Sequence, residues 1–360
     1  MHSSLHNKAY KNTLLIANGH ESYFHDLKGF SERLYYIDPY YQENNFLKDL
    51  NTFKSFIKKN NICIKETAII YSSGLEDKIE IQKYLDKNFC IYGNSFSKYR
   101  YISDIKNLEK YTSSKSILFP KLSKEEKDKF ILKHKYSSGG MGVGIKSKKG
   151  DYYFQEFISG PVYSVSFIAY SNHIKILGYN RQFSILNNDD YPYLHSGLMM
   201  VGKNFKYHIL IKNFLYTIIK SERLKGFSSF DFIIKDAKIY FLEINARLSS
   251  SYRLYREKYG SSLLLNHTDC NKDKLISKNN KYHAYIILYA KSDILIDERI
   301  LNTKDAIDKP RLGEKIFRNQ PILTLKISSS SKNSLQNKIK TRINCAMEFI
   351  DCYNTDLNYE

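Results

Sequence analysis

The chain has 360 residues, a length typical of two or three domains, and its hydrophobic content of 42% is enough for a sizeable core. Its 56 Lys and Arg against 37 Asp and Glu give a net charge of +19, which favours anionic partners or substrates. No apolar run approaches the roughly 20 residues that cross a bilayer, and the first residues lack the apolar core of a secretory signal. We therefore expect a cytoplasmic enzyme without membrane contact.

The cysteines and the basic residues both lack a functional pattern. The five cysteines are scattered without a C-x-x-C pair, so neither a zinc site nor a disulfide framework is predicted. Lysines recur in nearly every segment beside Asn, Ile and Tyr, which resembles a composition bias more than a designed patch. No nucleic-acid-binding signature accompanies them. A basic nucleic-acid-binding protein is therefore the weakest of the functional alternatives.

Residues 13 to about 100 alternate between short apolar runs and amphipathic stretches, which predicts a small parallel sheet with helices. The turns at Gly19 and at Ser73-Gly74 would then follow strands, at the edge where open α/β sheets bind ligands. No glycine-rich fingerprint follows the first strand, so dinucleotide binding is not expected here. The expected strands are 13–18, 34–37, 67–71 and 89–92, and the expected helices are 46–58 and 75–85.

A polar helical connector over 95–110 leads to a predicted strand, FILKH at 130–134, which carries Lys133 near its end. The loop SSGGMGVG follows at 137–144, and its glycines allow backbone N–H groups to wrap a phosphate. Residues 143–148 have the pattern of another strand, whereas a Rossmann loop opens a helix and a Walker loop ends in Gly-Lys-Ser/Thr. Lys133 precedes the loop, whereas the corresponding lysine of protein kinases lies on the strand after their glycine-rich loop. A plain flexible turn is the alternative.

The segment QEFI at 155–158 ends the next predicted strand, and Gly160 makes a turn before a further strand near Ser164. Another strand over 173–181 ends in Arg181, which we expect either to face phosphates or a carboxylate, or to be solvated. A polar loop over 187–198 would cover the substrate, and its lone His195 is interpreted as structural. An amphipathic helix is predicted over 204–221.

Residues 226–251 contain two apolar β-runs joined by a short polar break, which predicts a hairpin. Asp231 lies on the first strand and Glu243 on the second, and the alternation of a strand places Glu243 and Asn245 on one face. Carboxylate and amide oxygens are hard ligands that suit Mg²⁺ or Mn²⁺. Arg247 would continue this face and suits a phosphate. A solvated surface hairpin is the alternative.

The remaining chain offers weaker signals. Arg253 and Arg256 lie in a short helical stretch and would either bind an anionic substrate or be solvated. A Lys- and Asn-rich segment over 270–281 precedes a predicted strand over 282–288. An amphipathic helix over 329–350 closes the pattern.

The run Glu243-Ile244-Asn245-Ala246-Arg247, with the upstream Asp231, resembles the E-x-N-x-R metal box of the ATP-grasp superfamily. The strand lysine with its glycine-rich loop resembles that family's phosphate loop, and QEFI resembles the hinge between its subdomains. The resemblance implies an α/β chain, α+β in its catalytic part. It would comprise a pre-ATP-grasp parallel-sheet domain at 1–100, an ATP-grasp domain at 101–265 with a nucleotide-binding subdomain at about 112–160, and a small C-terminal module at 266–360.

The resemblance also implies ATP with two Mg²⁺ or Mn²⁺ ions as cofactors. Metal would be bound by Asp231, Glu243 and Asn245, and the catalytic residues would be Arg247 and Arg181. The nucleotide would be held by Lys133, Ser138, Gly139, Gly140, Gln155, Glu156, Phe157, Ile158 and Ser164.

The implied activity is that of a carboxylate–amine ligase, in which a carboxylate takes the γ-phosphoryl group of ATP and an amine then displaces phosphate. A role in making a pterin- or furan-type one-carbon cofactor is one interpretation, and amino-acid or nucleotide-precursor ligation is another. A regulatory or non-catalytic ATP-binding protein is the main alternative, although the intact acidic set argues against it. The partners would be the small-molecule carboxylate and amine, and a homo-oligomer is left open.

Overall fold

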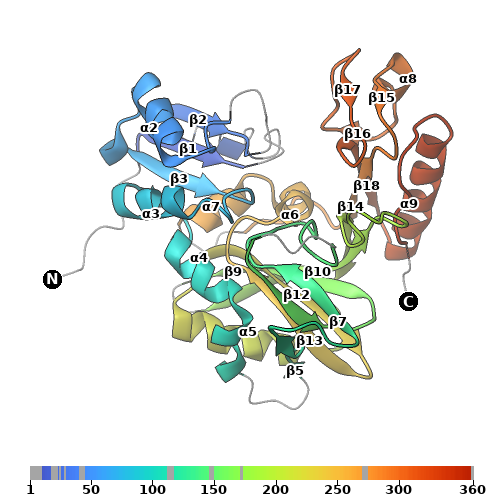
Figure 1. Cartoon of the computed structure of the whole chain (residues 1–360), viewed down its shortest axis with the longest axis horizontal. Helices are drawn as coiled ribbons and strands as arrows, with labels where there is room; N and C mark the ends of the chain where they lie inside the picture. Colours follow the sequence, from blue (N-terminus) through green and yellow to red (C-terminus); the bar gives the residue numbers. More distant parts are fainter. Residues whose placement is uncertain are drawn as a thin grey trace.

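The computed structural model describes residues 10–17, 23, 26–27, 30–39, 45–111, 117–145, 150–170, 173–269 and 275–357. Within them the chain is a mixed α/β structure, as the sequence predicts. Figure 1 shows a parallel sheet formed by the first strands, a large sheet in the middle and a C-terminal lobe that ends in a long helix. No helix of the described part is long and apolar enough to cross a membrane.

The N-terminal sheet is parallel, with the strand order β2-β1-β3-β4. Its strands are β1 (Asn12–Ile16), β2 (Arg33–Ile37), β3 (Thr67–Tyr71) and β4 (Cys90–Ile91), and its helices are α2 (Leu50–Lys59) and α3 (Ile79–Asn88), with the turn η1 (Ile64–Glu66). The helix predicted from residue 46 begins later because Asp49 caps it by accepting a hydrogen bond from Thr52 N at 2.8 Å. The turn at Gly19 lies outside the described residues.

The predicted connector over 95–110 is only partly α-helical. It forms α4 (Phe96–Ser103) and the short turns η2 (Ile105–Asn107) and η3 (Glu109–Tyr111). A three-stranded antiparallel sheet follows, made of β6 (Leu122–Ser123), β7 (Phe130–His134) and β8 (Tyr152–Glu156) in the order β6-β8-β7. The prediction of a strand over 143–148 is wrong for its first residues. Val143 forms only an isolated bridge with Lys133, and Gly144 turns the chain with a φ of 70°. Residues 146–149 lie outside the described part.

The central sheet has nine strands in the order β16-β18-β14-β11-β10-β9-β12-β13-β5. The strands are β5 (Ile117–Leu118), β9 (Val162–Ala169), β10 (Ile174–Ser184), β11 (His195–Gly202), β12 (Gly226–Lys235), β13 (Lys238–Asn245), β14 (Tyr282–Tyr289), β16 (Ala306–Ile307) and β18 (Pro321–Ser329). Helix α5 (His208–Glu222) packs on this sheet with its apolar face, including Ile211, Leu215 and Ile218.

The β12–β13 hairpin forms as predicted, and its turn has a clear local cause. Asp236 and Ala237 both have positive φ, 50° and 56°, as a type I′ turn requires, and such a turn matches the twist of the strands. The strand pairing then runs from Lys235↔Lys238 to Ser229↔Asn245, with one irregularity after Asp231. This register places Asp231 directly opposite Glu243.

The C-terminal lobe packs α9 (Lys332–Met347) on β14 and β18 around Ile286, Leu325, Ile339 and other apolar side chains. A small ribbon of β15 (Ile294–Leu295) and β17 (Lys315–Ile316), with α8 (Glu298–Leu301), projects from this lobe (Figure 1). The terminal helix therefore forms as predicted, although it starts at Lys332 because Ser331 caps it through Ser334 N.

The N-terminal sheet is joined to the central sheet by buried polar contacts. Asn94, just after β4, donates to Lys225 O at 2.8 Å and Ala246 O at 3.0 Å and accepts from Lys225 N at 2.9 Å. Helices α6 (Tyr252–Tyr259) and α7 (Ser262–Thr268) lie beside this junction. His267 of α7 is 2% exposed, and its Nδ1 accepts from Phe227 N at 3.0 Å. The ring also sits against Gly226, where a Cβ would lie 2.6 Å from it.

We expect the free energy of unfolding to fall as the pH is lowered from about 6.5 to 4. Burial lowers the pKa of His267 from 6.5 to about 4, so the unfolded chain binds a proton in this range that the folded chain excludes. The contribution is full above pH 6.5 and is lost by pH 4, and it amounts to roughly 3 kcal/mol. Urea unfolding at a series of pH values measures it. The variant His267→Gln should flatten this dependence, and an unchanged slope would contradict the assignment.

Candidate active site

One cavity of about 1540 Å³ is bordered by the three-stranded sheet, the central sheet, the N-terminal sheet and the C-terminal lobe. Every residue that the resemblance assigns to the metal, the nucleotide or catalysis contributes to its lining. These residues come from separate elements: β7 and its loop, β8 and the following segment, β9, β10, and the β12–β13 hairpin. The structure therefore brings the predicted set together around one space.

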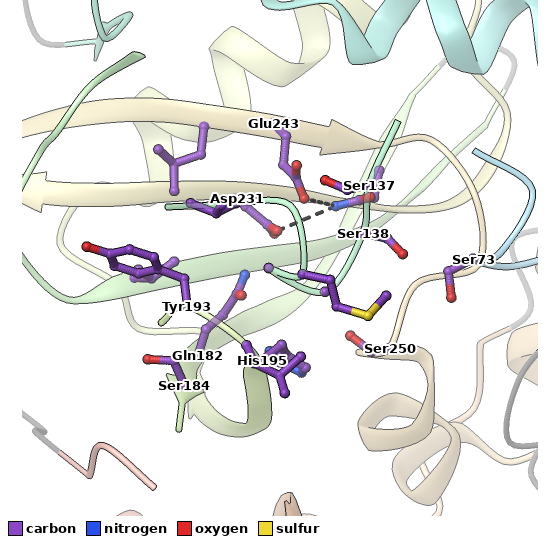
Figure 2. A pocket seen from close by; sticks show the side chains of 18 of the residues that line it. Ser73, Ser137, Ser138, Gln182, Ser184, Tyr193, His195, Asp231, Glu243 and Ser250 are labelled. Atoms are coloured by element: carbon purple, nitrogen blue, oxygen red, sulfur yellow. Dashed lines mark hydrogen bonds between the residues drawn. The ribbon is translucent and has the colours of Figure 1, made fainter. Parts of the chain in front are cut away.

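Two carboxylates and an amide form a cluster on the β12–β13 hairpin (Figure 2). Asn245 Nδ2 donates to Glu243 Oε1 at 2.9 Å and to Asp231 Oδ2 at 3.4 Å. Burial and the facing Glu243 carboxylate raise the pKa of Asp231 well above its usual range. Two like charges directly opposite on a hairpin destabilise it unless a positive group lies between them. Here the amide N–H₂ of Asn245 partly takes that place.

The donor set of this cluster fits Mg²⁺ or Mn²⁺. Its oxygens come from two carboxylates and, after an amide flip, from Asn245, and these are hard donors. A divalent cation would remove the repulsion that raises the pKa of Asp231. Within the described residues no group of three His, Cys, Asp or Glu side chains gathers to hold a metal.

Lys133 and Gln155 form a polar pair on the part of the cavity wall that β7 and β8 contribute. Lys133 Nζ donates to Gln155 Oε1 at 3.2 Å, across the antiparallel β7–β8 pair. Gln155 is 3% exposed, and its Nε2 has no hydrogen-bond partner within the part of the chain that the structure describes. A buried amide donor without a partner is costly, so this atom is available to donate a hydrogen bond to a bound molecule.

The glycine-rich loop rests on the segment that leads into β11. His195 N donates to Gly139 O at 2.9 Å. Gly140 has φ of 78°, and a Cβ there would lie 1.8 Å from Tyr193 O, so only glycine fits. Ser138 of the loop and Tyr193 are both seen in Figure 2 among the side chains that line the pocket. The loop is thus held close to the cavity by backbone contacts.

The segment after β8 connects the two sheets that border the cavity. Phe157 N donates to Lys129 O at 2.7 Å, and Glu156 Oε2 accepts from Lys121 N at 3.1 Å. The exposed Phe157 ring faces Tyr193, with 6.1 Å between ring centroids. Ile158 follows in the lining of the same cavity. The role of this segment in binding a nucleoside stays a prediction.

Ser164, which lines the cavity, belongs to a buried hydrogen-bond network. Its Oγ accepts from Asn180 Nδ2 at 3.2 Å, and Asn180 Oδ1 accepts from Tyr255 OH at 2.9 Å. Asn180 Nδ2 also donates to Ser166 Oγ at 3.1 Å, and Ser166 Oγ donates to Ser251 Oγ at 2.8 Å. Ser164 is therefore held in place by the protein's own polar groups.

The two arginines expected to be catalytic are both buried, at 6% exposure each. Arg247 does not continue the strand alternation, because β13 ends at Asn245; its Nη2 donates to Glu76 Oε1 at 2.9 Å. Arg181 lies within β10, and its Nη1 donates to the carbonyls of Val162 and Gln182 at 2.8 Å each. The alternative of a solvated strand-end Arg181 is therefore wrong. Both side chains line the cavity, and their catalytic roles stay predictions.

The same cavity extends to residues that the sequence pattern did not single out. Tyr285 of β14 and Asp308 line it, and Asp308 forms an ion pair with Arg253 of α6. No local motif marks Tyr285 or Asp308, because only tertiary packing brings them there. Arg256, the other candidate of this helix, pairs instead with Asp26 at 2.8 Å.

His195 is also placed as a structural residue would be. Its Nε2 lies 3.1 Å from Tyr285 OH, and burial lowers its pKa to about 4. His195 also lines the cavity. The polar loop predicted over 187–198 ends earlier, because β11 begins at His195.

Comparison with known proteins gives a consistent result for the central part of the chain. Residues 97–251 match the family described as "ATP-grasp domain". The chain is 28% identical over 266 residues to "Uncharacterized protein MJ0776" of Methanocaldococcus jannaschii, a match that covers 68% of this chain and 63% of that relative. The chain thus spans less than two thirds of that relative's length.

Solved structures share the whole architecture at low identity. The L-amino acid ligase from Bacillus licheniformis has a TM-score of 0.64 at 11% identity, covering 94% of this chain and 98% of its own. The biotin carboxylase domain of 2-oxoglutarate carboxylase from Hydrogenobacter thermophilus, a dimer in complex with MgADP, ADP and bicarbonate, also has a TM-score of 0.64, at 10% identity, covering 97% and 92%. These similarities show a shared fold.

Proposed function

We propose that the chain, whose residues 97–251 match the family described as "ATP-grasp domain", is an ATP-dependent ligase of the ATP-grasp superfamily. It would activate a small-molecule carboxylate as an acyl phosphate and join it to an amine, forming a carbon–nitrogen bond. The observation that carries the proposal is the acidic cluster of Asp231, Glu243 and Asn245 in the same cavity as Lys133 and the glycine-rich loop.

Each step assigns a task to residues of this cavity. Lys133 and the loop at Ser138 to Gly140 would hold the phosphates of ATP, and Gln155 to Ile158 would hold the nucleoside. Asp231, Glu243 and Asn245 would bind two Mg²⁺ or Mn²⁺ ions, which supply charge neutralisation when bound. The chain's own contribution is then to align a substrate carboxylate oxygen with the γ-phosphorus.

The bonds balance without an enzyme nucleophile. The substrate carboxylate oxygen attacks the γ-phosphorus, the bond to the β-phosphate oxygen breaks, and ADP leaves. An amine nitrogen then attacks the acyl carbon, the carbon–oxygen bond to phosphate breaks, and the amine loses a proton as the amide forms. Arg253, with Asp308 beside it, is the cation that we propose for the carboxylate substrate. An amino acid or a pterin- or furan-type cofactor precursor would both offer such a carboxylate.

The test is release of phosphate from Mg-ATP with a panel of carboxylates, each with and without amines. We expect release that needs both substrates and that falls about a hundredfold or more in Glu243→Ala, because one charged ligand is lost. Glu298→Ala, at an exposed helix start outside the cavity lining, is the matched control. Substrate-dependent release that persists in Glu243→Ala would contradict the assigned site. ATP binding without any stimulated release would favour a regulatory ATP-binding protein.

A further inference from the structure

A second cavity, of about 270 Å³, shares no lining residue with the first. It lies where β11 and β14 stop pairing, beyond the pair Met199↔Ala284. From there β11 continues to Gly202, while β14 begins at Tyr282. Helix α6 contributes Tyr255 and Lys258 to the lining, and β10 contributes Leu177 and Gly178.

Three lysines reach this cavity from three separate parts of the chain. Lys203 follows β11, Lys258 lies on α6 and Lys281 precedes β14. No carboxylate is among the residues that line the cavity. The adjacent acid on α6, Glu257, pairs instead with Lys326 at 3.2 Å and with Arg256 at 3.8 Å. Positive charge is therefore gathered here without a neutralising group among the lining residues.

The environment of Lys258 shows the consequence of this arrangement. Burial and the nearby Lys203 lower the pKa of its ammonium group. Repulsion between like charges in a partly buried space is relieved when an anion enters. Three neutral hydrogen-bonding side chains, Asn204, Asn280 and Tyr282, complete the polar lining.

The walls keep the space open between the cations. Gly178 forms part of the lining, and a Cβ there would lie 2.6 Å from Tyr255 OH, so a larger residue at 178 would displace this ring. Tyr255 is itself fixed by its hydrogen bond to Asn180 at 2.9 Å. The cavity is thus built by packed elements and not by surface side chains alone.

We propose that this second cavity binds a phosphate group, carried either by orthophosphate or by a phosphomonoester. Lysine acts as a point charge for phosphate, whereas a planar carboxylate is better matched by the fork of an arginine, and no arginine lines this space. Three lysines from separate segments of the chain suit an anion with more than one negative charge and several oxygens. The inference does not depend on the activity proposed for the first cavity.

The test is isothermal titration calorimetry on the full chain with orthophosphate and, separately, with glucose 6-phosphate. Lys133→Gln is used as the background, so that phosphate binding at the first cavity is weakened throughout. We expect a binding event whose affinity falls at least about tenfold when Lys203, Lys258 and Lys281 are all changed to Gln. Tighter binding of glucose 6-phosphate would assign a phosphomonoester, and tighter binding of orthophosphate would assign the free ion.

The control replaces three exposed lysines of the N-terminal part, Lys58, Lys65 and Lys87, with Gln. It removes the same net charge and should leave the affinity within about twofold of the background. Equal weakening in the control would show general attraction to a basic protein and would overturn the proposal. Absence of binding by either probe, or unchanged binding in the cavity variant, would overturn it as well. Far-ultraviolet circular dichroism would confirm that the variants are folded.

Discussion

Asp231→Asn should lower ATP turnover by about a thousandfold while it raises the melting temperature of the ligand-free protein. The loss follows because this carboxylate faces Glu243 and Asn245 at the point assigned to the metal ions, where charge on the transferring phosphoryl group is neutralised. The melting temperature should rise because the charged Asp231 carboxylate is buried and faces the like charge of Glu243. Activity and stability are therefore expected to change in opposite directions.

The sign of the stability change comes from the pKa of Asp231. Burial and the Glu243 carboxylate raise that pKa above its value in the unfolded chain. At a pH above the unfolded pKa, the folded state therefore binds more protons than the unfolded state. Stability contributed by this group is consequently lost with rising pH. Asparagine carries no charge and keeps the size of the side chain, so the variant should be more stable at neutral pH by on the order of 1–2 kcal/mol.

Thermal unfolding without and with Mg-ATP measures both effects. The variant should melt several degrees higher than the parent without ligand, and it should gain less from Mg-ATP, because the metal ligand is missing. Asp128→Asn, an exposed acid outside the cavity lining, is the matched control. A variant that melts lower than the parent would show that Asp231 is a structural ion and not a strained metal ligand.

Local patterns predicted much of this fold. The hairpin of β12 and β13, the strand FILKH and the parallel N-terminal strands each appear at the expected residues because their apolar alternation and turn chemistry are local properties. The acidic cluster was predictable for the same reason, since strand alternation sets the face of Glu243 and Asn245. Boundaries shifted mainly where a cap decides the start of a helix, as at Asp49.

Other parts of the site depend on contacts between distant segments and left no local pattern. The glycine-rich loop was recognisable, but its contacts with Tyr193 and His195 join segments that lie far apart in the sequence. Asp308 reaches Arg253 from another lobe. Arg247 shows the limit most clearly, because alternation predicted its direction only as far as the strand extends, and β13 ends two residues earlier.

The ion pair of Arg247 and Glu76 leads to the second large effect. Arg247→Met should lower the free energy of unfolding by about 3–5 kcal/mol, because it leaves the carboxylate of Glu76 buried without its cation. Glu76 cannot turn away easily, since its Oε2 also accepts from Gly74 N at 2.6 Å. The guanidinium lies 5.5 Å from the Tyr99 ring as well, so its removal also loses packing.

A double-mutant cycle with Glu76→Gln separates the structural role of Arg247 from a catalytic one. If the pair mainly holds the end of β3 against the hairpin, the double variant should recover stability relative to the sum of the single variants, by roughly 1–3 kcal/mol of coupling. Urea unfolding gives these energies, and phosphate release by each folded variant gives the activities. Because Glu76 has no proposed contact with ATP, equal loss of activity in both single variants would assign Arg247 to positioning. A large loss confined to Arg247→Met, with full activity in Glu76→Gln, would instead place the guanidinium at the phosphoryl group, as the motif implies.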